Sequence, residues 1–166
     1  MSREIKIEVF SSVMSERAYY TARQKLGLIS TDLAEQNIEL GVAGGTNDFH
    51  DNAAFDEASR KIDVTGISYE TWRKTIMYPV FIERRVETDS VQLGNLVDIE
   101  IVTFGERFKA NILGPVDGIL FEDDSISFES PLGRALIGHV KGEEIEYEAA
   151  SRKLKAKIID VLPGNF

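Results

Sequence analysis

Apolar residues recur with heptad spacing along two stretches in the first half of the chain. In each stretch the steps between successive members alternate between three and four residues, and only one member is polar. This spacing is the a/d pattern of a coiled coil, in which one face of each helix packs against a partner. The first stretch comprises Tyr19, Ala22, Leu26, Ile29, Leu33, Gln36, Leu40 and Ala43, and the second comprises Phe55, Ala58, Ile62, Thr65, Tyr69, Trp72 and Ile76.

The link between the two stretches is short and contains Gly44, Gly45 and Asn47. So short a link makes the two helices antiparallel. Folding at the link places Leu26 near Trp72 at the far end, so the two seams face each other. We therefore expect a hairpin whose aromatic seam residues are core, with helices of roughly 30 residues, about 45 Å long.

After Pro79, which should end the second helix, the period of the pattern becomes two. Five segments alternate in this way: "LVDIEIVTF", "RFKANIL", "SISF", "EIEYEA" and "KLKAKIIDV". They predict short antiparallel strands. Among them, "SPLGRALIG" predicts one short helix with Ser130 as N-cap, Pro131 at its first position and Gly138 closing its C-terminus. The predicted fold class is α+β, with a coiled-coil hairpin over 1–77 and a small sheet domain over 78–166.

Composition narrows the class of protein further. There are no cysteines, which excludes disulfides and cysteine-ligated zinc and fits a reducing cytosol. No apolar run approaches the roughly 20 residues of a membrane span, and "MSREIKIEVFSS" lacks the apolar core of a secretory signal, so we expect a cytoplasmic protein without a membrane partner. The net charge of −9 argues against a protein that coats nucleic acid.

The acidity is uneven along the chain. Residues 1–85 carry 11 basic and 13 acidic residues, whereas residues 86–166 carry 8 and 15. This asymmetry favours two units with different roles.

Two aspartates, Asp48 and Asp51, stand in the predicted tip at 44–54, within "GGTNDFHDNAAFDEAS". One of them can cap the second helix, which typically stabilises a helix by about 1 kcal/mol. Capping does not require two aspartates, nor Phe49 between them. Mg²⁺ is often bound by one or two carboxylates together with substrate phosphates, so a metal role is the second interpretation, and the two roles are compatible. His50 is interpreted as an ordinary loop residue.

Two segments of the chain resemble a known family. "DSISFESPLGRALIGHVKGEEIEYE" resembles the C-terminal domain of the bacterial Gre transcript-cleavage factors, of the GreA/GreB type, and "NDFHDNAAFDEA" resembles the tip of that family. The order of the expected elements matches as well. The resemblance implies an FKBP-like sheet domain that docks at the rim of the secondary channel of RNA polymerase. It also implies a hairpin that enters the channel and stimulates the polymerase's own cleavage of backtracked RNA.

The resemblance also implies roles for individual residues. The tip acids would share a Mg²⁺ ion with the polymerase, so the chain would be neither a nuclease by itself nor the owner of a cofactor. The second tip acid is usually glutamate in the family, where this chain has aspartate. The implied roles are Asp48 and Asp51 at the polymerase active site, Phe49, Asn52 and Phe55 in shaping the tip, Arg60 and Lys61 on phosphates near the 3′ end of the nascent RNA, and Ser130 and Pro131 at the polymerase rim.

Several alternatives stay open at this point. The altered tip acid is compatible with a regulator that occupies the channel without promoting cleavage. An independent metal-dependent hydrolase would need more candidate ligands than the sequence offers, and a prolyl isomerase is suggested only by the expected sheet fold, which does not establish function. Arg60 and Lys61 can equally be part of a solvated helix face. We expect a monomer, because the seam is used within the hairpin.

Overall fold

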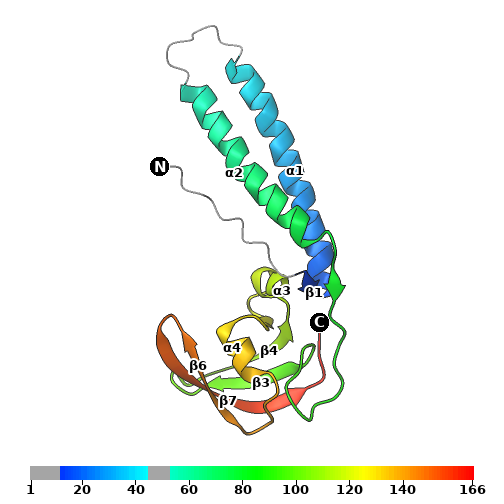
Figure 1. Cartoon of the computed structure of the whole chain (residues 1–166), viewed down its shortest axis with the longest axis vertical. Coiled ribbons are helices and arrows are strands. Elements are labelled where there is room, and N and C mark those ends of the chain that lie inside the picture. Colours follow the sequence, from blue (N-terminus) through cyan, green and yellow to red (C-terminus); the bar gives the residue numbers. More distant parts are fainter. Residues whose placement is uncertain (1–11, 45–52) are drawn as a thin grey trace. The chain divides into compact units, whose positions relative to one another are not determined.

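A computed structural model describes residues 12–44 and 53–166 of the chain. The described residues form two compact units (Figure 1). One unit contains residues 20–44 and 53–78, and the other contains residues 12–19 together with 79–166. The division falls within the first helix, so the first turn of that helix belongs to the unit that holds the main sheet.

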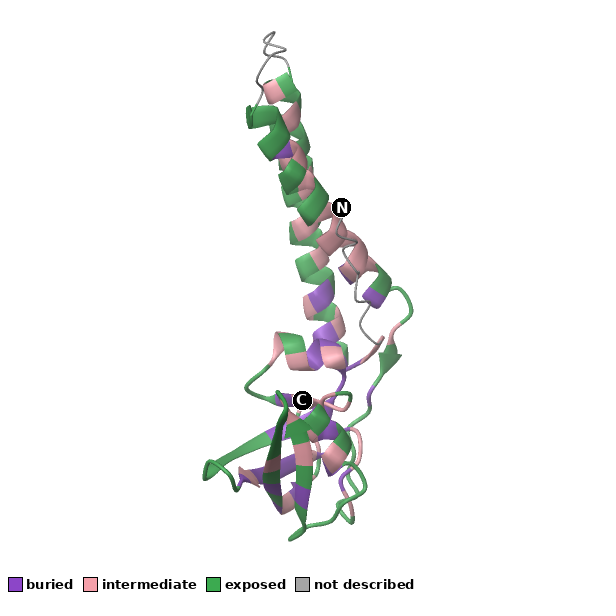
Figure 2. Cartoon of the chain, turned by 60° about the vertical axis from the view of Figure 1, so that its left-hand side comes forward, coloured by how far each residue is buried: buried purple, intermediate pink, exposed green. Residues whose placement is uncertain are grey.

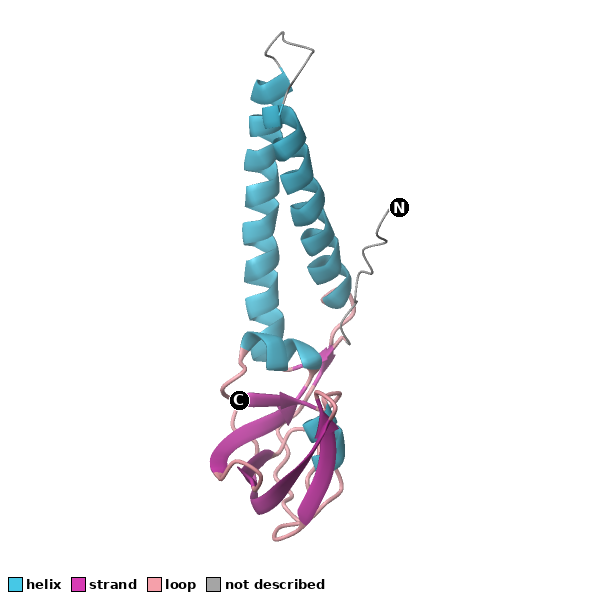
Figure 3. Cartoon of the chain, turned by 90° about the vertical axis from the view of Figure 1, so that its left-hand side faces the viewer, coloured by secondary structure: helices cyan, strands magenta, loops and turns pink. Residues whose placement is uncertain are grey.

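The first unit is the predicted hairpin. Helix α1 (Glu16–Gly44) and helix α2 (Ala53–Thr75) lie side by side, and α2 ends before Pro79 as expected (Figures 1 and 3). All eight predicted seam positions of α1 are buried or partly buried, while most other positions of α1 are exposed (Figure 2). On α2 every seam position is likewise shielded except Phe55, which is 38% exposed. The heptad prediction is therefore confirmed.

Contacts at both ends of the hairpin agree with the predicted pairing of the helices. At one end, the Lys25 ammonium lies 4.6 Å from the centre of the Trp72 ring, one residue from the predicted Leu26–Trp72 pair. At the other end, the Phe55 ring lies 3.6 Å from the point where a Cβ on Gly44 would stand. Between them, the Gln36 side-chain oxygen is buried without a hydrogen-bond partner among the described residues. This polar seam position weakens the hairpin, because a buried polar atom without a partner costs free energy.

The second unit is built on a five-stranded sheet with strand order β5-β4-β3-β7-β6, and all five predicted strands are present (Figure 3). β3 pairs antiparallel with β4 and β7, and β6 pairs antiparallel with β7. The strands are β3 (Leu96–Ile101), β4 (Glu106–Leu113), β5 (Ser125–Ser127), β6 (Glu144–Ala149) and β7 (Arg152–Leu162).

Two details of the predicted sheet domain are wrong. β5 is parallel to β4, not antiparallel, because an unpredicted helix, α3 (Pro115–Leu120), carries the chain between them. The unit therefore has two short helices, α3 and the predicted α4 (Pro131–Leu136), where one was expected. A second small sheet, in which β1 (Val13–Met14) pairs parallel with β2 (Val80–Phe81), was not predicted either.

The core of this unit lies on one face of the main sheet. The other face carries charged side chains that are neighbours across adjacent strands. Side chains of alternating positions on β3, β6 and β7 pack with Val91 and Leu136 in a continuous apolar cluster. On the paired strands β6 and β7, the register sets three glutamates against three lysines. Lys155, for example, lies 3.4 Å from Glu144 and 3.3 Å from Glu146. Part of the charge of the acidic half is therefore paired across these strands.

Candidate functional site

Four of the predicted site residues lie outside the described residues. These are Asp48, Phe49, Asp51 and Asn52, and His50 lies outside them too. Their roles stay predictions. The structure does locate the helix ends on either side, since α1 ends at Gly44 and α2 begins at Ala53. The acidic segment therefore connects two helices whose seams are paired, as the sequence predicted.

The two cations predicted to meet RNA lie on consecutive positions of α2 and are both exposed. The Arg60 Nε donates to the Asp56 carbonyl at 3.3 Å, and its guanidinium lies 3.6 Å from the Glu57 carboxylate. Arg60 thus folds back along its own helix, while Lys61 projects about 100° around the helix from it. Both side chains help to line a shallow groove of ≈ 350 Å³ on the hairpin, together with Gln36, Glu57, Val64 and Thr65.

Ser130 and Pro131 occupy the predicted cap and first position of α4. The Ser130 hydroxyl accepts the Gly133 N–H at 3.0 Å and donates to the Ser127 carbonyl at 2.7 Å, so this side chain is used within the fold. Pro131 is exposed and stays available to a partner. Gly133 is required here, because a Cβ at this position would lie 2.0 Å from the Ser127 carbonyl oxygen.

The segment that follows α4 exposes apolar side chains that the sequence reasoning did not single out. Ile137 is 41% exposed and Val140 is 40% exposed. The chain between them turns at Gly138, whose φ of 86° suits glycine, as predicted. The Glu143 carboxylate accepts the Val140 N–H at 2.9 Å and contacts His139 Nδ1 at 2.7 Å, and these two bonds lower the pKa of Glu143. Pro131 and this ordered turn together give α4 an exposed rim with apolar members.

A buried polar cluster fixes the first turn of α1 to α3. The Asp117 carboxylate, which is fully buried, accepts the Ser15 N–H at 3.0 Å and also the Ser15 hydroxyl. The Ser15 oxygen in turn accepts the Ala18 N–H at 3.1 Å and so caps α1. This cluster was missed, since Ser15 and Asp117 are far apart in the sequence. The available signal was a serine directly before a helix.

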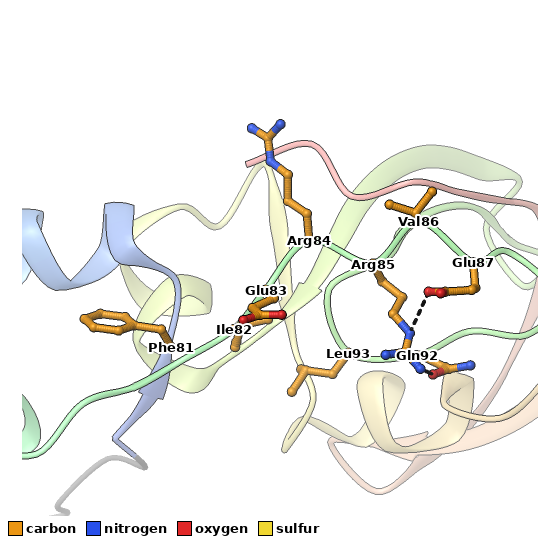
Figure 4. Close-up of a pocket in the computed structure, with 9 residues that line it drawn as sticks. All are labelled: Phe81, Ile82, Glu83, Arg84, Arg85, Val86, Glu87, Gln92 and Leu93. Carbon is orange, nitrogen blue, oxygen red and sulfur yellow. Dashed lines mark hydrogen bonds and ion pairs between the residues drawn. The ribbon is translucent and has the colours of Figure 1, made fainter.

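A cavity of ≈ 470 Å³ lies beside the segment that follows β2 (Figure 4). Two of its charged members form an ion pair: the Arg85 guanidinium lies 3.3 Å from the Glu87 carboxylate and also donates to the Gln92 side chain. Within residues 12–44 and 53–166, no three histidine, aspartate or glutamate side chains gather where they could hold a metal ion. The described part of the chain thus offers no metal cage of its own.

The family model and the relatives that this chain matches are all described as transcription elongation factors. The family model described as "Transcription elongation factor, GreA/GreB, C-term" matches residues 86–163. Transcription elongation factor GreA of Desulfovibrio desulfuricans is 30% identical over 150 residues, covering 89% of this chain and 91% of that protein. The GreA of Lachnoclostridium phytofermentans is 30% identical over 119 residues, covering 71% and 74%.

The chain therefore belongs to the GreA/GreB family of transcription elongation factors, which confirms the resemblance drawn from its sequence. Among solved structures, GreA factor homolog 1 (Gfh1) of Thermus thermophilus is similar, with 21% identity, a TM-score of 0.41 and coverage of 89% of this chain and 96% of that one. In the described ranges, no helix is long and apolar enough to cross a membrane.

Proposed function

We propose that this chain binds RNA polymerase, inserts its hairpin through the secondary channel, and stimulates the polymerase's own cleavage of backtracked RNA. The observation that carries the proposal is the placement of an acidic segment between two paired helices, in a chain that belongs to a family of elongation factors. A paired hairpin can present a short segment at a distance from the domain that docks. Neither an enzyme active site nor a cofactor of its own is needed for this role.

The chemistry at the tip would be electrostatic and positional. Hydrolysis of a phosphodiester with two metal ions needs a Mg²⁺ near the scissile phosphate and a water in position to attack. Mg²⁺ accepts one or two protein carboxylates and keeps several waters, so Asp48 and Asp51 suit it as partial ligands. The remaining ligands would come from the polymerase and the RNA. Aspartate is one methylene shorter than glutamate, so Asp51 would bring the ion closer to the backbone of the tip.

Two further surfaces would support this role. Lys61, and Arg60 after release from Glu57, can contact phosphates near the displaced 3′ end of the RNA. Pro131 and the exposed rim of α4 can contact the outer rim of the channel. Ser130 would act through its cap, because its hydroxyl is already used to hold the first turn of α4.

The test is RNA cleavage in a stalled, backtracked elongation complex that carries a 3′-labelled transcript and Mg²⁺. We expect short 3′ fragments only when both polymerase and this chain are present, and their loss with Asp48→Ala and with Asp51→Ala. Asp56→Ala is the matched control, because Asp56 is an exposed acid in the first turn of α2 outside the tip. Fragments formed without polymerase would show a nuclease and contradict the proposal.

Absence of cleavage by the wild-type chain, while it still competes with another channel ligand, would select the alternative function. The chain would then be a channel-binding regulator that modulates polymerase without stimulating cleavage. The observation that favours this alternative is the aspartate at position 51, where the family usually has glutamate.

A further inference from the structure

The outer face of α1 differs from the outer face of α2 in the same hairpin. On α2, most exposed positions away from the seam carry polar residues such as Asp56, Arg60 and Lys74, as expected for a helix face in water, and Val64, at 66%, is the large apolar exception. On α1, the corresponding face exposes three large apolar side chains: Leu28 at 70%, Ile38 at 69% and Val42 at 71%. Glycines at 27 and 41 border this face, and a Cβ at either would meet no atom of the described residues within 4 Å.

These exposed residues follow a second heptad pattern, which is separate from the seam that pairs with α2. The steps along it are four, three, four, three and four residues. Such spacing places all six members on one side of the helix, in the pattern that packs against another helix. We call this set the outer stripe; it consists of Gln24, Leu28, Thr31, Glu35, Ile38 and Val42.

We propose that the outer stripe is a self-association surface, on which a second copy of this chain docks with its α1 antiparallel. The sequence of steps along the stripe reads the same in both directions, so a two-fold axis near residue 33 superposes the stripe on its own partner. In this register Leu28 packs against Ile38 of the second copy, and Gln24 packs against Val42. A surface that complements itself under a two-fold axis is the requirement for a symmetric dimer.

The charges on and beside the stripe favour the antiparallel arrangement. A parallel pair would set Glu35 against Glu35 of the second copy inside the contact, where like charges repel. The antiparallel pair instead sets Glu35 opposite Thr31. The Thr31 hydroxyl, which donates to the Gly27 carbonyl at 3.2 Å within one chain, can turn to donate to that carboxylate. On one border of the stripe, Lys25 comes opposite Glu39 of the second copy.

The other border of the stripe lets the two helices approach closely. It is formed by Gly27, Ala34 and Gly41, which also recur every seven residues. Under the same two-fold axis Ala34 meets Ala34 of the second copy, and Gly27 meets Gly41. This arrangement gives the two mid-helix glycines a packing role.

The expected dimer is weak. Six side chains on each copy bury less than the roughly 1,200–2,000 Å² of a stable specific interface, so we expect a dissociation constant on the order of 100 µM. At low concentration the chain would be a monomer, as expected from the internal use of the first seam. The proposal does not depend on the proposed role at the polymerase.

Sedimentation equilibrium on the full chain, from about 10 µM to about 1 mM, would measure the association. Ile38→Lys should weaken it roughly tenfold or more, since the change places two charges in the apolar layers of each dimer. Val64→Lys is the matched control, because Val64 is 66% exposed but lies on α2. It should leave the association unchanged.

Cysteine cross-linking would test the register, because the natural chain has no cysteine. Under mild oxidation Ala34→Cys should give a disulfide-linked dimer. Val42→Cys should not, since the two positions would lie roughly 27 Å apart in the antiparallel pair. Circular dichroism of each variant would verify that the hairpin is intact.

Three results would overturn the proposal. They are a chain that stays monomeric up to about 1 mM, association that Ile38→Lys leaves unchanged, and cross-linking through Val42→Cys but not through Ala34→Cys. A monomeric chain whose binding to RNA polymerase is weakened by Ile38→Lys would assign the outer stripe to a polymerase contact instead.

Discussion

Removing the Asp117 carboxylate should destabilise the unit that holds the main sheet, and the structure sets the size of the effect. Asp117 and Ser15 are both fully buried, and the carboxylate accepts two hydrogen bonds from Ser15. Asp117→Ala leaves the N–H and the hydroxyl of Ser15 buried without that acceptor. Each of these two groups costs about 1–3 kcal/mol, so the free energy of unfolding should fall by about 2–6 kcal/mol.

A double-mutant cycle separates this contact from a general loss of packing. Ser15→Ala removes the hydroxyl that donates to Asp117 and also caps α1 at Ala18. Because the two residues share one contact, the double variant should lose less stability than the sum of the single variants, by about 1–3 kcal/mol. Asp124→Ala is the control: Asp124 is 64% exposed at 3.7 Å from Arg17, so its removal should cost less than about 1 kcal/mol.

Urea unfolding followed by two probes would measure these changes. The single tryptophan, Trp72, lies in the hairpin unit, so its fluorescence reports that unit while circular dichroism reports both. We expect the Asp117 and Ser15 variants to shift the circular dichroism transition. Strictly additive losses, or a loss below about 0.5 kcal/mol for Asp117→Ala, would refute the reasoning that Ser15 depends on this acceptor.

Three further predictions concern the rest of the fold. Gly133→Ala should lower the free energy of unfolding by more than about 2 kcal/mol, because the added Cβ would collide with the Ser127 carbonyl. Gly41→Ala should instead raise it by up to about 1 kcal/mol in urea unfolding, because a Cβ at Gly41 meets no atom of the described residues within 4 Å. Gln36→Leu should stabilise the hairpin by about 1 kcal/mol, because it removes a buried polar atom that has no partner among the described residues. An unchanged or lower fluorescence midpoint would contradict this. The Arg107 guanidinium donates to the Asp98 carboxylate at 2.8 Å and lowers the pKa of that carboxyl. The contribution of this ion pair to the free energy of unfolding is therefore present above about pH 4 and is lost as the pH falls further. Arg107→Leu should reduce the loss of unfolding free energy as the pH falls below about 4. An unchanged loss would exclude the Asp98–Arg107 pair as its cause.

The sequence predicted the hairpin well because its signal is periodic and local. The heptad positions named from the spacing are the shielded positions of α1, and Pro79 marked the end of α2 correctly. Ser130, Pro131 and Gly138 were placed correctly for the same reason, since caps and turns depend on the backbone of a few neighbouring residues.

What could not be predicted depends on contacts between distant segments. The parallel pairing of β5 with β4 follows from α3, whose six residues are too few to show a helical period. The close approach of Gly114 to Val13, where a Cβ would lie 1.8 Å from the carbonyl oxygen, has no local signature. The contact between Ser15 and Asp117 joins the beginning of α1 to α3 and becomes visible only once the chain is folded.

The candidate site likewise has features that the sequence predicted and features that it did not. Phe55, Arg60 and Lys61 lie on α2 as the pattern predicted, but the pairing of Arg60 with Glu57 was not foreseen. The spacing predicts which residues share a helix face, whereas the rotamer of a long exposed side chain depends on its neighbours. The exposed apolar residues that follow α4, Ile137 and Val140, were missed because the residues of a turn show no periodic pattern.

The most direct test of the account measures the rate of RNA cleavage in backtracked polymerase complexes as a function of Mg²⁺ concentration. We expect Asp48→Ala and Asp51→Ala to slow cleavage and to require more Mg²⁺. We also expect Asp51→Glu, which retains the carboxylate, to stay active, and Asp56→Ala to behave as the wild type. Equal rates and equal Mg²⁺ dependence for the wild type and both tip variants would contradict the claim that the tip aspartates hold the metal ion.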